Sequence, residues 1–510
     1  MIKTIDKNDW PLFRMIIPAF PEINIFTRQA RKTTALGPIM VATAANKLWR
    51  WRVEIIDENN NRKGPRDSNG LPDHAVLQKE RPATAVGFYC GLTSTMLRVW
   101  ELAEFYHQQK VFTIAGAWHA HYCPEETLNH NIDVVVHRDA ERVIQQILSN
   151  LGKEKFLENI PGISFLENGE FKTDTSEIVQ VLGLDPNLSN LPFPDFGLLR
   201  YAKIKLYPIS RIRGCSGNCE FCSVNEKPHW ACAKHLFETV KWLVETRNAK
   251  EFFLVDDSLK EDLDGTVESF KMITNEYGNR LDISIQLWLK IAENTEFLQT
   301  ARRAGVRTAC IGVESPIDED LKAMRKGYTS SKMLEWLKIL QRYVKTHIML
   351  IAGYPLEERN VFLSAKEIVK RFRRFIHKAH PDSVHVMLPG PGVGTPLRRR
   401  LEKEGRLFPQ SIVPWSKYDG RFVCFRPSNM TVRELQEMPF KIMGRFYNRW
   451  SSIRIAIRTI IFPLDYIVRG WKNWHRDWVR DVVKFGGYLL MEKWKAKQQT
   501  DEFIEKLENH

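Results

Sequence analysis

The stretch RIRGCSGNCEFCSVNE, residues 211–226, gathers three of the chain's eight cysteines within eight positions. Cys215, Cys219 and Cys222 follow the spacing C-x3-C-x2-C. A thiolate is a soft ligand that binds zinc or the iron of an iron–sulfur cluster in preference to hard cations. Three thiolates in one short loop therefore indicate a metal centre, and the identity of the fourth ligand is the open question.

Two kinds of metal centre fit three cysteines. A structural zinc site is closed by four protein ligands, and Cys232 or His229 could supply the fourth one here. A cubane held by three thiolates leaves one iron open to an outside ligand. We favour the cubane, because the missing protein ligand then has a chemical purpose.

Length and composition set the wider frame. The chain has 510 residues, of which 43% are apolar and 27% charged, which is typical of a globular protein of two to four domains. The first residues lack the apolar segment of a secretory signal, and no run of about 18 uncharged apolar residues predicts a spanning helix. Eight dispersed cysteines favour a reducing compartment. We therefore expect a cytoplasmic protein.

Residues 1–160 alternate between short apolar strands and amphipathic helices. Strands are predicted at 12–18, 51–57, 84–90, 111–116 and 132–136. This order predicts a doubly wound, Rossmann-like α/β domain with a parallel sheet. Ligands of such sheets bind at the carboxyl ends of the strands, where the loops CGLTS and AGAWHA lie. Residues 161–200 contain LPFPDF and are interpreted as a linker, since proline interrupts helices and central strands.

A second alternating series covers residues 201–405. Its predicted strands are IKLYPISRIRG, EFFLVDD, LDISIQL, VRTACIGVES, HIMLIAGYP and SVHVMLP, with helices between them. Six consecutive β/α units without a reversal predict a partial (β/α)6 barrel. Chemistry in such barrels takes place at the carboxyl ends of the strands. The cysteine loop follows the first of these strands.

At these residues the sequence resembles the radical S-adenosylmethionine (radical SAM) superfamily. The cysteine spacing, with Phe221 before the last cysteine, matches the motif of that family. The segments VDDS (Asp256, Asp257), IGVES (Glu314, Ser315), IAGYPLEE (Gly353) and PGVGTPL (391–397) resemble later landmarks of the same barrel. One departure is Leu356, which stands where the family has a glycine.

The resemblance implies a set of cofactors and residue roles. Cys215, Cys219 and Cys222 would hold a [4Fe-4S] cluster, and SAM would chelate the open iron and yield a 5′-deoxyadenosyl radical. The SAM-binding residues implied are Phe221, Asp256, Glu314, Ser315 and Gly353. An electron donor such as flavodoxin or ferredoxin would be needed. Two alternatives stay open: Glu314 as an ion-pair partner within the barrel, and Asp256 and Asp257 as caps of the following helix.

The N-terminal domain resembles the cobalamin-binding domain that precedes many radical SAM barrels. The resemblance rests on VFTIAGAWHAHYCPEETLNHNIDVVV and the helix after it, and it implies cobalamin binding near Thr93, Ser94 and Gly116. Ala115 replaces the first glycine of the family's glycine pair, and the DxHxxG signature is absent. The alternative is a domain that has lost cobalamin and only buttresses the barrel.

Residues 406–510 have a helical pattern that is interrupted by Pro463 and Gly470. Between 440 and 500, 13 Lys or Arg residues stand against four Asp or Glu residues, which accounts for nine of the chain's fourteen net positive charges. Five tryptophans lie in the same window: Trp450, Trp471, Trp474, Trp478 and Trp494. The pattern fits peripheral contact with an anionic membrane surface. It also fits a helical cap with its aromatic residues turned inward.

These features are compatible with three candidate functions. The first is a cobalamin-dependent radical SAM enzyme that methylates or rearranges an unactivated carbon of a small metabolite, lipid or peptide. The second, a methylthiotransferase of transfer RNA, would need three cysteines upstream, and only Cys90 and Cys123 precede Cys215, so we do not expect a nucleic-acid partner. The third is a non-catalytic zinc scaffold. No residue is marked as a substrate ligand or a hydrogen-atom relay, so the catalytic residues are left unassigned.

Overall fold

The protein is described by a computed structural model that covers residues 9–21, 27–173, 187–224, 226–356, 363–460, 474–498 and 501–509. The chain forms two compact units. The first consists of Met1–Arg213 with Lys227–Val255, and the second of Gly214–Glu226 with Asp256–His510.

The first unit is built on an eight-stranded sheet with the order β7-β6-β5-β4-β3-β1-β2-β8. Its strands are β1 (Leu12–Ile17), β2 (Arg52–Asp57), β3 (Ala85–Tyr89), β4 (Phe112–Gly116), β5 (Val134–Val136), β6 (Ile163–Glu167), β7 (Glu170–Thr173) and β8 (Leu199–Arg200). β1 pairs in parallel with β2 on one side and with β3 on the other. The order in which successive strands are added to the sheet therefore reverses between β1 and β3, which is the position where doubly wound folds bind their ligands.

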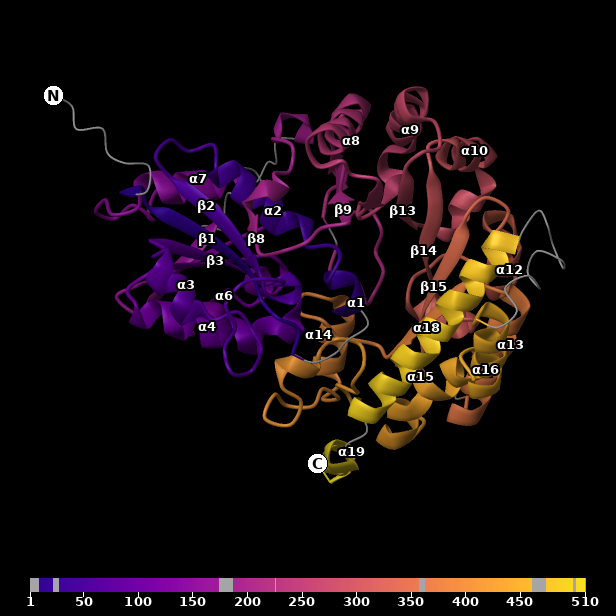
Figure 1. The fold of residues 1–510 in the computed structure, drawn as a ribbon. Helices are drawn as coiled ribbons and strands as arrows, with labels where there is room; N and C mark the ends of the chain where they lie inside the picture. Colours follow the sequence, from indigo (N-terminus) through magenta and orange to yellow (C-terminus); the bar gives the residue numbers. More distant parts are fainter. Residues whose placement is uncertain are drawn as a thin grey trace. The chain divides into compact units, whose positions relative to one another are not determined.

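Helices cover both faces of this sheet, as predicted for a doubly wound domain. α2 and α7 pack against each other on one face, and α3 and α4 lie on the other (Figure 1). The helices of this unit are α1 (Thr27–Ala30), α2 (Leu36–Ala45), α3 (His74–Glu80), α4 (Met96–Gln108), α5 (Trp118–Tyr122), α6 (Pro124–Leu128), α7 (Glu141–Asn150) and α8 (Ala233–Arg247). Every residue of β1 is buried, because a central strand of such a sheet is covered from both sides.

The predicted linker, residues 161–200, contributes three strands to this sheet, and in this the structure differs from the prediction. β6 and β7 form an antiparallel hairpin beside β5. The two-residue turn between them is Asn168-Gly169, with φ values of 53° and 83°. An Asn-Gly pair with both φ values positive is the preferred hairpin turn, so the hairpin is marked in the sequence even though the nearby prolines favour a linker.

The second sheet has six strands in the order β16-β15-β14-β13-β12-β9. They are β9 (Leu206–Ile209), β12 (Glu251–Leu254), β13 (Asp282–Leu287), β14 (Val306–Glu314), β15 (Lys345–Ile351) and β16 (Ser383–Met387). The order follows the chain, as the predicted partial (β/α)6 barrel requires. The first predicted strand is split in two: β9 ends at Ile209, and β10 (Ile212–Arg213) pairs with β11 (His229–Trp230) as a separate antiparallel ribbon.

The second unit carries the remaining helices: α9 (Leu263–Tyr277), α10 (Thr295–Arg303), α11 (Asp318–Ala323), α12 (Ser330–Leu340), α13 (Ala365–Ala379), α14 (Pro396–Lys403), α15 (Val432–Phe446), α16 (Arg449–Ile460), α18 (Trp474–Gln498) and α19 (Asp501–Glu508). The prediction of a helical C-terminal region is confirmed. Pro463 and Gly470 lie outside the described residues.

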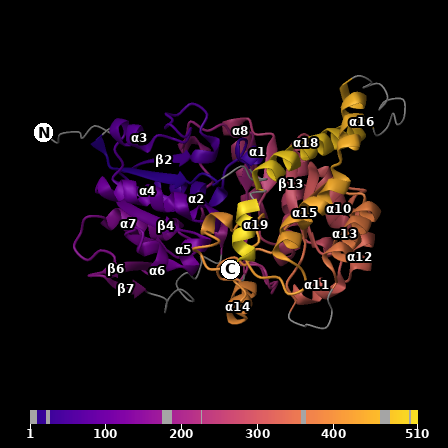
Figure 2. The same cartoon turned by 90° about the horizontal axis from the view of Figure 1, so that it is seen from below.

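The C-terminal helices pack against the barrel side of their own unit. α18 contacts α15, α16 and β16, and it runs along α15 and α16 in Figure 2. Trp494 of α18 is buried and meets the rings of His385 and Phe440 edge-on, with centroid distances of 5.9 and 5.2 Å. Trp450 is 77% exposed. No helix among the described residues is long and apolar enough to cross a bilayer.

Candidate functional site

The cysteine loop begins at Gly214 and is tied to the segment that follows β12. Gly214 has a positive φ of 82°, and its backbone N–H donates to the Asp257 carboxylate over 2.8 Å. Ser216 donates to Glu261 through both its backbone N–H and its hydroxyl, over 3.1 and 3.0 Å. The Asp257 and Glu261 carboxylates thus anchor the cysteine loop by accepting hydrogen bonds from its backbone and from the Ser216 hydroxyl.

All three cysteines of the loop are free thiols and partly buried. The backbone N–H of Gly217 donates to the Cys215 sulfur over 3.3 Å, and that of Val224 to the Cys222 sulfur over 3.4 Å. Burial raises the pKa of Cys222 to about 11, and the neighbouring Cys219 and Cys215 add to this effect. A bound cationic centre would relieve this repulsion between neighbouring thiolates.

The spacing of the three thiols fits a cubane better than a single zinc ion. Zinc bound by thiolates at about 2.3 Å in a tetrahedron would bring the sulfurs to within about 4 Å of one another. Among the described residues, the only group of three potential ligands within 4.8 Å of one another is His119, Cys123 and Glu126. The three thiols of the loop are not all within 4.8 Å of one another, which is compatible with the larger core of an iron–sulfur cluster.

A buried acidic residue inside the loop was missed by sequence reasoning. Glu220 is 4% exposed. Its carboxylate accepts two hydrogen bonds from Arg400 of α14, over 2.7 and 3.1 Å, and one from the Tyr354 hydroxyl over 2.6 Å. The backbone carbonyl of Glu220 also accepts from Leu397 N–H over 2.9 Å. The middle of the cysteine loop is thereby fastened to α14 and to the turn after β15.

Glu314 and Phe221, two predicted SAM-binding residues, are brought together by Lys326. The Lys326 ammonium lies 2.9 Å from the Glu314 carboxylate and 5.1 Å from the centre of the Phe221 ring. Burial alone would lower the pKa of Lys326, but Glu314, Tyr328 and Cys219 outweigh it and raise this pKa. Glu314 has a φ of 64°, which is strained for a residue with a side chain. This strained acidic residue ends β14, next to the cysteine loop.

Ser315 contacts Asp320 of α11, whereas its neighbour Glu314 contacts Lys326. Its side chain is buried, its hydroxyl donates to Asp320 over 2.6 Å, and it accepts from the Ile317 N–H over 3.2 Å. Burial raises the pKa of Asp320 to about 7. The hydroxyl of Ser315 therefore anchors the start of α11 in this structure.

The other predicted SAM residues lie at strand ends of the barrel. Asp256, which follows β12 and Val255, is 2% exposed. The carboxylate that caps α9 is Asp262, whereas Asp257 holds Gly214. Gly353 has a φ of 76°, and a Cβ at this position would lie 2.3 Å from Leu435 of α15. Both backbone conformation and space therefore demand glycine at this turn.

The residues implied for cobalamin lie at the carboxyl edge of the first sheet. Thr93 and Ser94 follow β3, and Gly116 ends β4. Ala117, the next residue, has φ 79° and ψ −170°, a conformation that is essentially restricted to glycine. A Cβ at Gly116 would meet nothing closer than the Val136 carbonyl at 3.5 Å. This strained turn, with a small residue beside it, therefore ends β4 at the carboxyl edge of the sheet.

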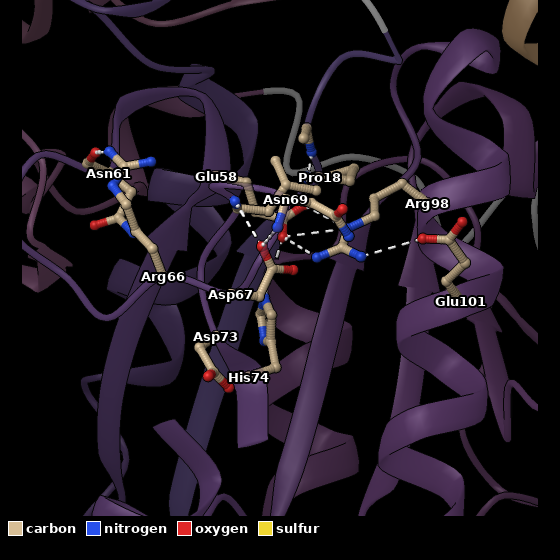
Figure 3. A network of polar contacts seen from close by, with 12 residues as sticks. Pro18, Glu58, Asn61, Arg66, Asp67, Asn69, Asp73, His74, Arg98 and Glu101 are labelled. Carbon is tan, nitrogen blue, oxygen red and sulfur yellow. Dashed lines mark hydrogen bonds and ion pairs between the residues drawn. The ribbon is translucent and has the colours of Figure 1, made fainter. Parts of the chain in front are cut away.

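A buried polar network stands at the same edge, at the end of β2, and sequence reasoning missed it too. Glu58 accepts from Arg98 over 2.7 Å and from the Ala19 N–H over 2.7 Å, and His74 lies 3.2 Å away (Figure 3). Burial alone would raise the pKa of Glu58, but His74 and Arg98 outweigh it and lower this pKa. The network fixes the loops after β1 and β2 against α3 and α4. It is assembled from residues as far as 40 positions apart, which no local pattern predicts.

A second ion-pair group holds the residue before the cysteine loop. Arg213 lies 2.7 Å from Asp139 and 2.6 Å from Glu141, and His229 lies 3.1 Å from Asp139. Burial alone would raise the pKa of Asp139, but Arg213 and His229 lower it to about 2. The turn at the start of α7, which carries Asp139 and Glu141, thus positions the strand that leads into the cysteine motif.

Comparison with known proteins finds a family match that includes the cysteine loop, and relatives that are named methyltransferases or methylases. Residues 209–365 match the radical SAM superfamily. An uncharacterized methyltransferase of Pyrococcus horikoshii is 24% identical over 433 residues, which span 82% of this chain and 88% of that protein. The hopanoid C-2 methylase of Rhodopseudomonas palustris is 23% identical over 270 residues, 48% of this chain and 50% of that protein. The chain thus matches half the length of the hopanoid methylase.

The fold of the whole chain has a counterpart among solved structures. The cobalamin-dependent S-adenosylmethionine radical enzyme OxsB, with aqua-cobalamin bound, matches with a TM-score of 0.64 at 14% identity. The match covers 98% of this chain and 80% of OxsB, so it includes the N-terminal sheet as well as the barrel. The cysteine loop and the family match together show that residues 209–365 form a radical SAM domain, and the cofactors of that superfamily are a [4Fe-4S] cluster and SAM.

Proposed function

We propose that this radical SAM enzyme is cobalamin-dependent and transfers a methyl group to an unactivated carbon. The observation that carries the proposal is the fold match to OxsB over 98% of the chain. A barrel alone would suffice for SAM cleavage, yet the likeness extends over the N-terminal sheet. Two sequence relatives are named a methyltransferase and a methylase, which supports methyl transfer over rearrangement.

The cluster and SAM would be held by residues of the second unit. Cys215, Cys219 and Cys222 are the cluster ligands. When bound, the cluster supplies the electron that cleaves SAM to a 5′-deoxyadenosyl radical. Glu314, held by Lys326, offers a desolvated carboxylate as acceptor for polar groups of SAM, and the Phe221 ring beside Lys326 would contact SAM.

Cobalamin would bind at the carboxyl edge of the first sheet, near Thr93, Ser94 and Gly116. When bound, it supplies a methyl group that is transferred to the substrate. The substrate is proposed to be a small metabolite, a lipid or a peptide, and a flavodoxin or ferredoxin would deliver the electron.

The test is anaerobic co-purification of the full chain with hydroxocobalamin, followed by gel filtration and by counts of iron and cobalt. We expect about four irons and about one cobalt per chain. The variant Cys219→Ala is the matched control, because it should lose iron and keep cobalt. Four irons without cobalt would overturn the cobalamin proposal and leave a radical SAM enzyme whose N-terminal sheet has another role.

Methyl transfer itself has a separate readout. With SAM and reductant, a methyl donor that is regenerated from SAM yields S-adenosylhomocysteine, and hydrogen abstraction yields 5′-deoxyadenosine. We expect both products in the cobalamin-loaded enzyme. Formation of 5′-deoxyadenosine alone, in a protein that does hold cobalamin, would contradict methyl transfer and favour rearrangement.

A further inference from the structure

We propose that His119, Cys123 and Glu126 form a binding site for a zinc-type divalent ion in the first unit, separate from the cysteine loop. The ligand atoms of the three residues all lie within 4.8 Å of one another. The His119 Nε2 atom is 3.5 Å from the Glu126 carboxylate. Ligands around one tetrahedral zinc ion are separated by roughly 3–4 Å, so the group needs little rearrangement to close on a metal.

The local backbone holds the three residues in place. The Cys123 N–H donates to the His119 carbonyl over 2.9 Å, and Cys123 follows the last residue of α5 as its C-cap. Pro124 then starts α6, and Glu126 lies in its first turn. The Thr127 N–H donates to the Cys123 carbonyl over 3.0 Å. The spacing H-x3-C-x2-E is therefore presented by two short helices that meet at Cys123.

The surroundings of His119 favour metal binding through its Nε2 atom. The side chain is completely buried, and its Nδ1 atom lies 3.3 Å from the Thr93 hydroxyl. In the tautomer whose Nδ1–H donates to this hydroxyl, the lone pair is on Nε2, which is the orientation of metal-ligating histidines. The Glu126 side chain is 32% exposed, so an ion can reach the group from solvent.

The donor set selects the kind of metal. One imidazole nitrogen, one thiolate and one carboxylate are a borderline-soft set that suits zinc and excludes magnesium and calcium. Three protein ligands leave one coordination position for water or an outside ligand. His119 and Glu126 alone would make an ordinary ion pair. Cys123 is the residue that distinguishes a metal site from such a pair, and the test is built on it.

The experiment measures zinc in the full chain after the [4Fe-4S] cluster has been reconstituted, so that the loop thiols are occupied. The protein is incubated with zinc chloride, passed over a desalting column, and analysed for zinc and iron by mass spectrometry. We expect about one zinc per chain in the wild type. We expect at least a fivefold loss of zinc in Cys123→Ser and in Glu126→Gln, with the iron content unchanged.

The matched control is Cys232→Ser, which removes an exposed cysteine outside the group and should keep the zinc. Circular dichroism checks that each variant is folded. A wild type without zinc, or equal zinc in the wild type and in folded Cys123→Ser, would overturn the proposal. Because Thr93 also belongs to the proposed cobalamin site, the assay is run without cobalamin, and its readout requires no turnover.

Discussion

The Arg400 guanidinium donates two hydrogen bonds to the Glu220 carboxylate, from Nε to Oε1 over 2.7 Å and from Nη2 to Oε2 over 3.1 Å. The two residues are 180 positions apart, and Glu220 stands between the second and third cysteines of the loop. The same guanidinium donates to the Pro355 carbonyl over 2.7 Å. These contacts of Arg400 with Glu220 and Pro355, here called the clamp, fix the backbone that carries the cluster ligands. Glu220 is therefore a positioning residue rather than a ligand.

Loss of the clamp is expected to loosen the cluster. Glu220→Gln leaves the guanidinium without its carboxylate in a buried setting, which costs about 3–5 kcal/mol in the free energy of unfolding. We expect a lower unfolding midpoint and fewer irons per chain after reconstitution and gel filtration. The control Arg399→Gln removes an exposed neighbour whose side chain donates to the Gly394 carbonyl, and it should behave as wild type. Full iron retention in Glu220→Gln would refute the positioning role.

Glu314→Gln is expected to weaken SAM binding about tenfold, or ~1.4 kcal/mol, because a charged acceptor is lost. Affinity is measured by anaerobic equilibrium dialysis of the reconstituted enzyme. Glu319→Gln is the control, since this residue is an exposed acid nearby on α11. If Glu314→Gln lowers stability but leaves the affinity unchanged, the carboxylate is an ion-pair partner of Lys326 and nothing more.

Asp320 makes the stability of the second unit depend on pH. Its pKa is about 7 in the folded protein because of burial, against 3.8 for an ordinary aspartate. The folded state thus binds the extra proton between these values, and stability falls as the pH rises through this window. We expect Asp320→Asn to be more stable than wild type at pH 8, by about 1–4 kcal/mol, and similar to it at pH 4.

Urea denaturation at pH 4, 6 and 8 checks this prediction. The groups that face Asp320 are Ser315 and Arg371, which lower its pKa, and Glu319, which raises it. Glu319→Gln should therefore reduce the pH dependence slightly and Asp320→Asn should remove it. An identical pH profile in wild type and Asp320→Asn would show that the carboxyl ionises normally.

Two tryptophans distinguish a helical cap from a membrane contact. Trp494 is 5% exposed, so Trp494→Ala should cost about 3–5 kcal/mol in the free energy of unfolding. Trp450 is exposed, and Trp450→Ala should change it by less than about 0.5 kcal/mol. Co-sedimentation with anionic vesicles tests the membrane interpretation. If that interpretation is correct, Trp450→Ala lowers the fraction of protein that binds to the vesicles. A Trp494→Ala variant of unchanged stability would contradict the cap.

Local sequence patterns account for much of this protein. The cysteine spacing, the strand and helix order of both sheets, and the helical C-terminal region depend on such patterns, because hydrophobic periodicity and ligand spacing repeat over a few residues. The Asn168-Gly169 turn belongs to the same class, although the linker interpretation of residues 161–200 does not include it. Even the radical SAM assignment rests on short segments such as the cysteine loop and IGVES.

The tertiary structure alone decided which distant residues meet. Nothing local marks Arg400 as the partner of Glu220, or Arg98 and His74 as the partners of Glu58, because charged residues are common and their pairing depends on how the elements fold together. The same holds for Ser315, whose hydroxyl anchors α11. The sequence by itself determined the chemistry of the ligands and the order of the elements. Folding determined their neighbours, since burial and ion pairing arise only when segments far apart in the chain come into contact.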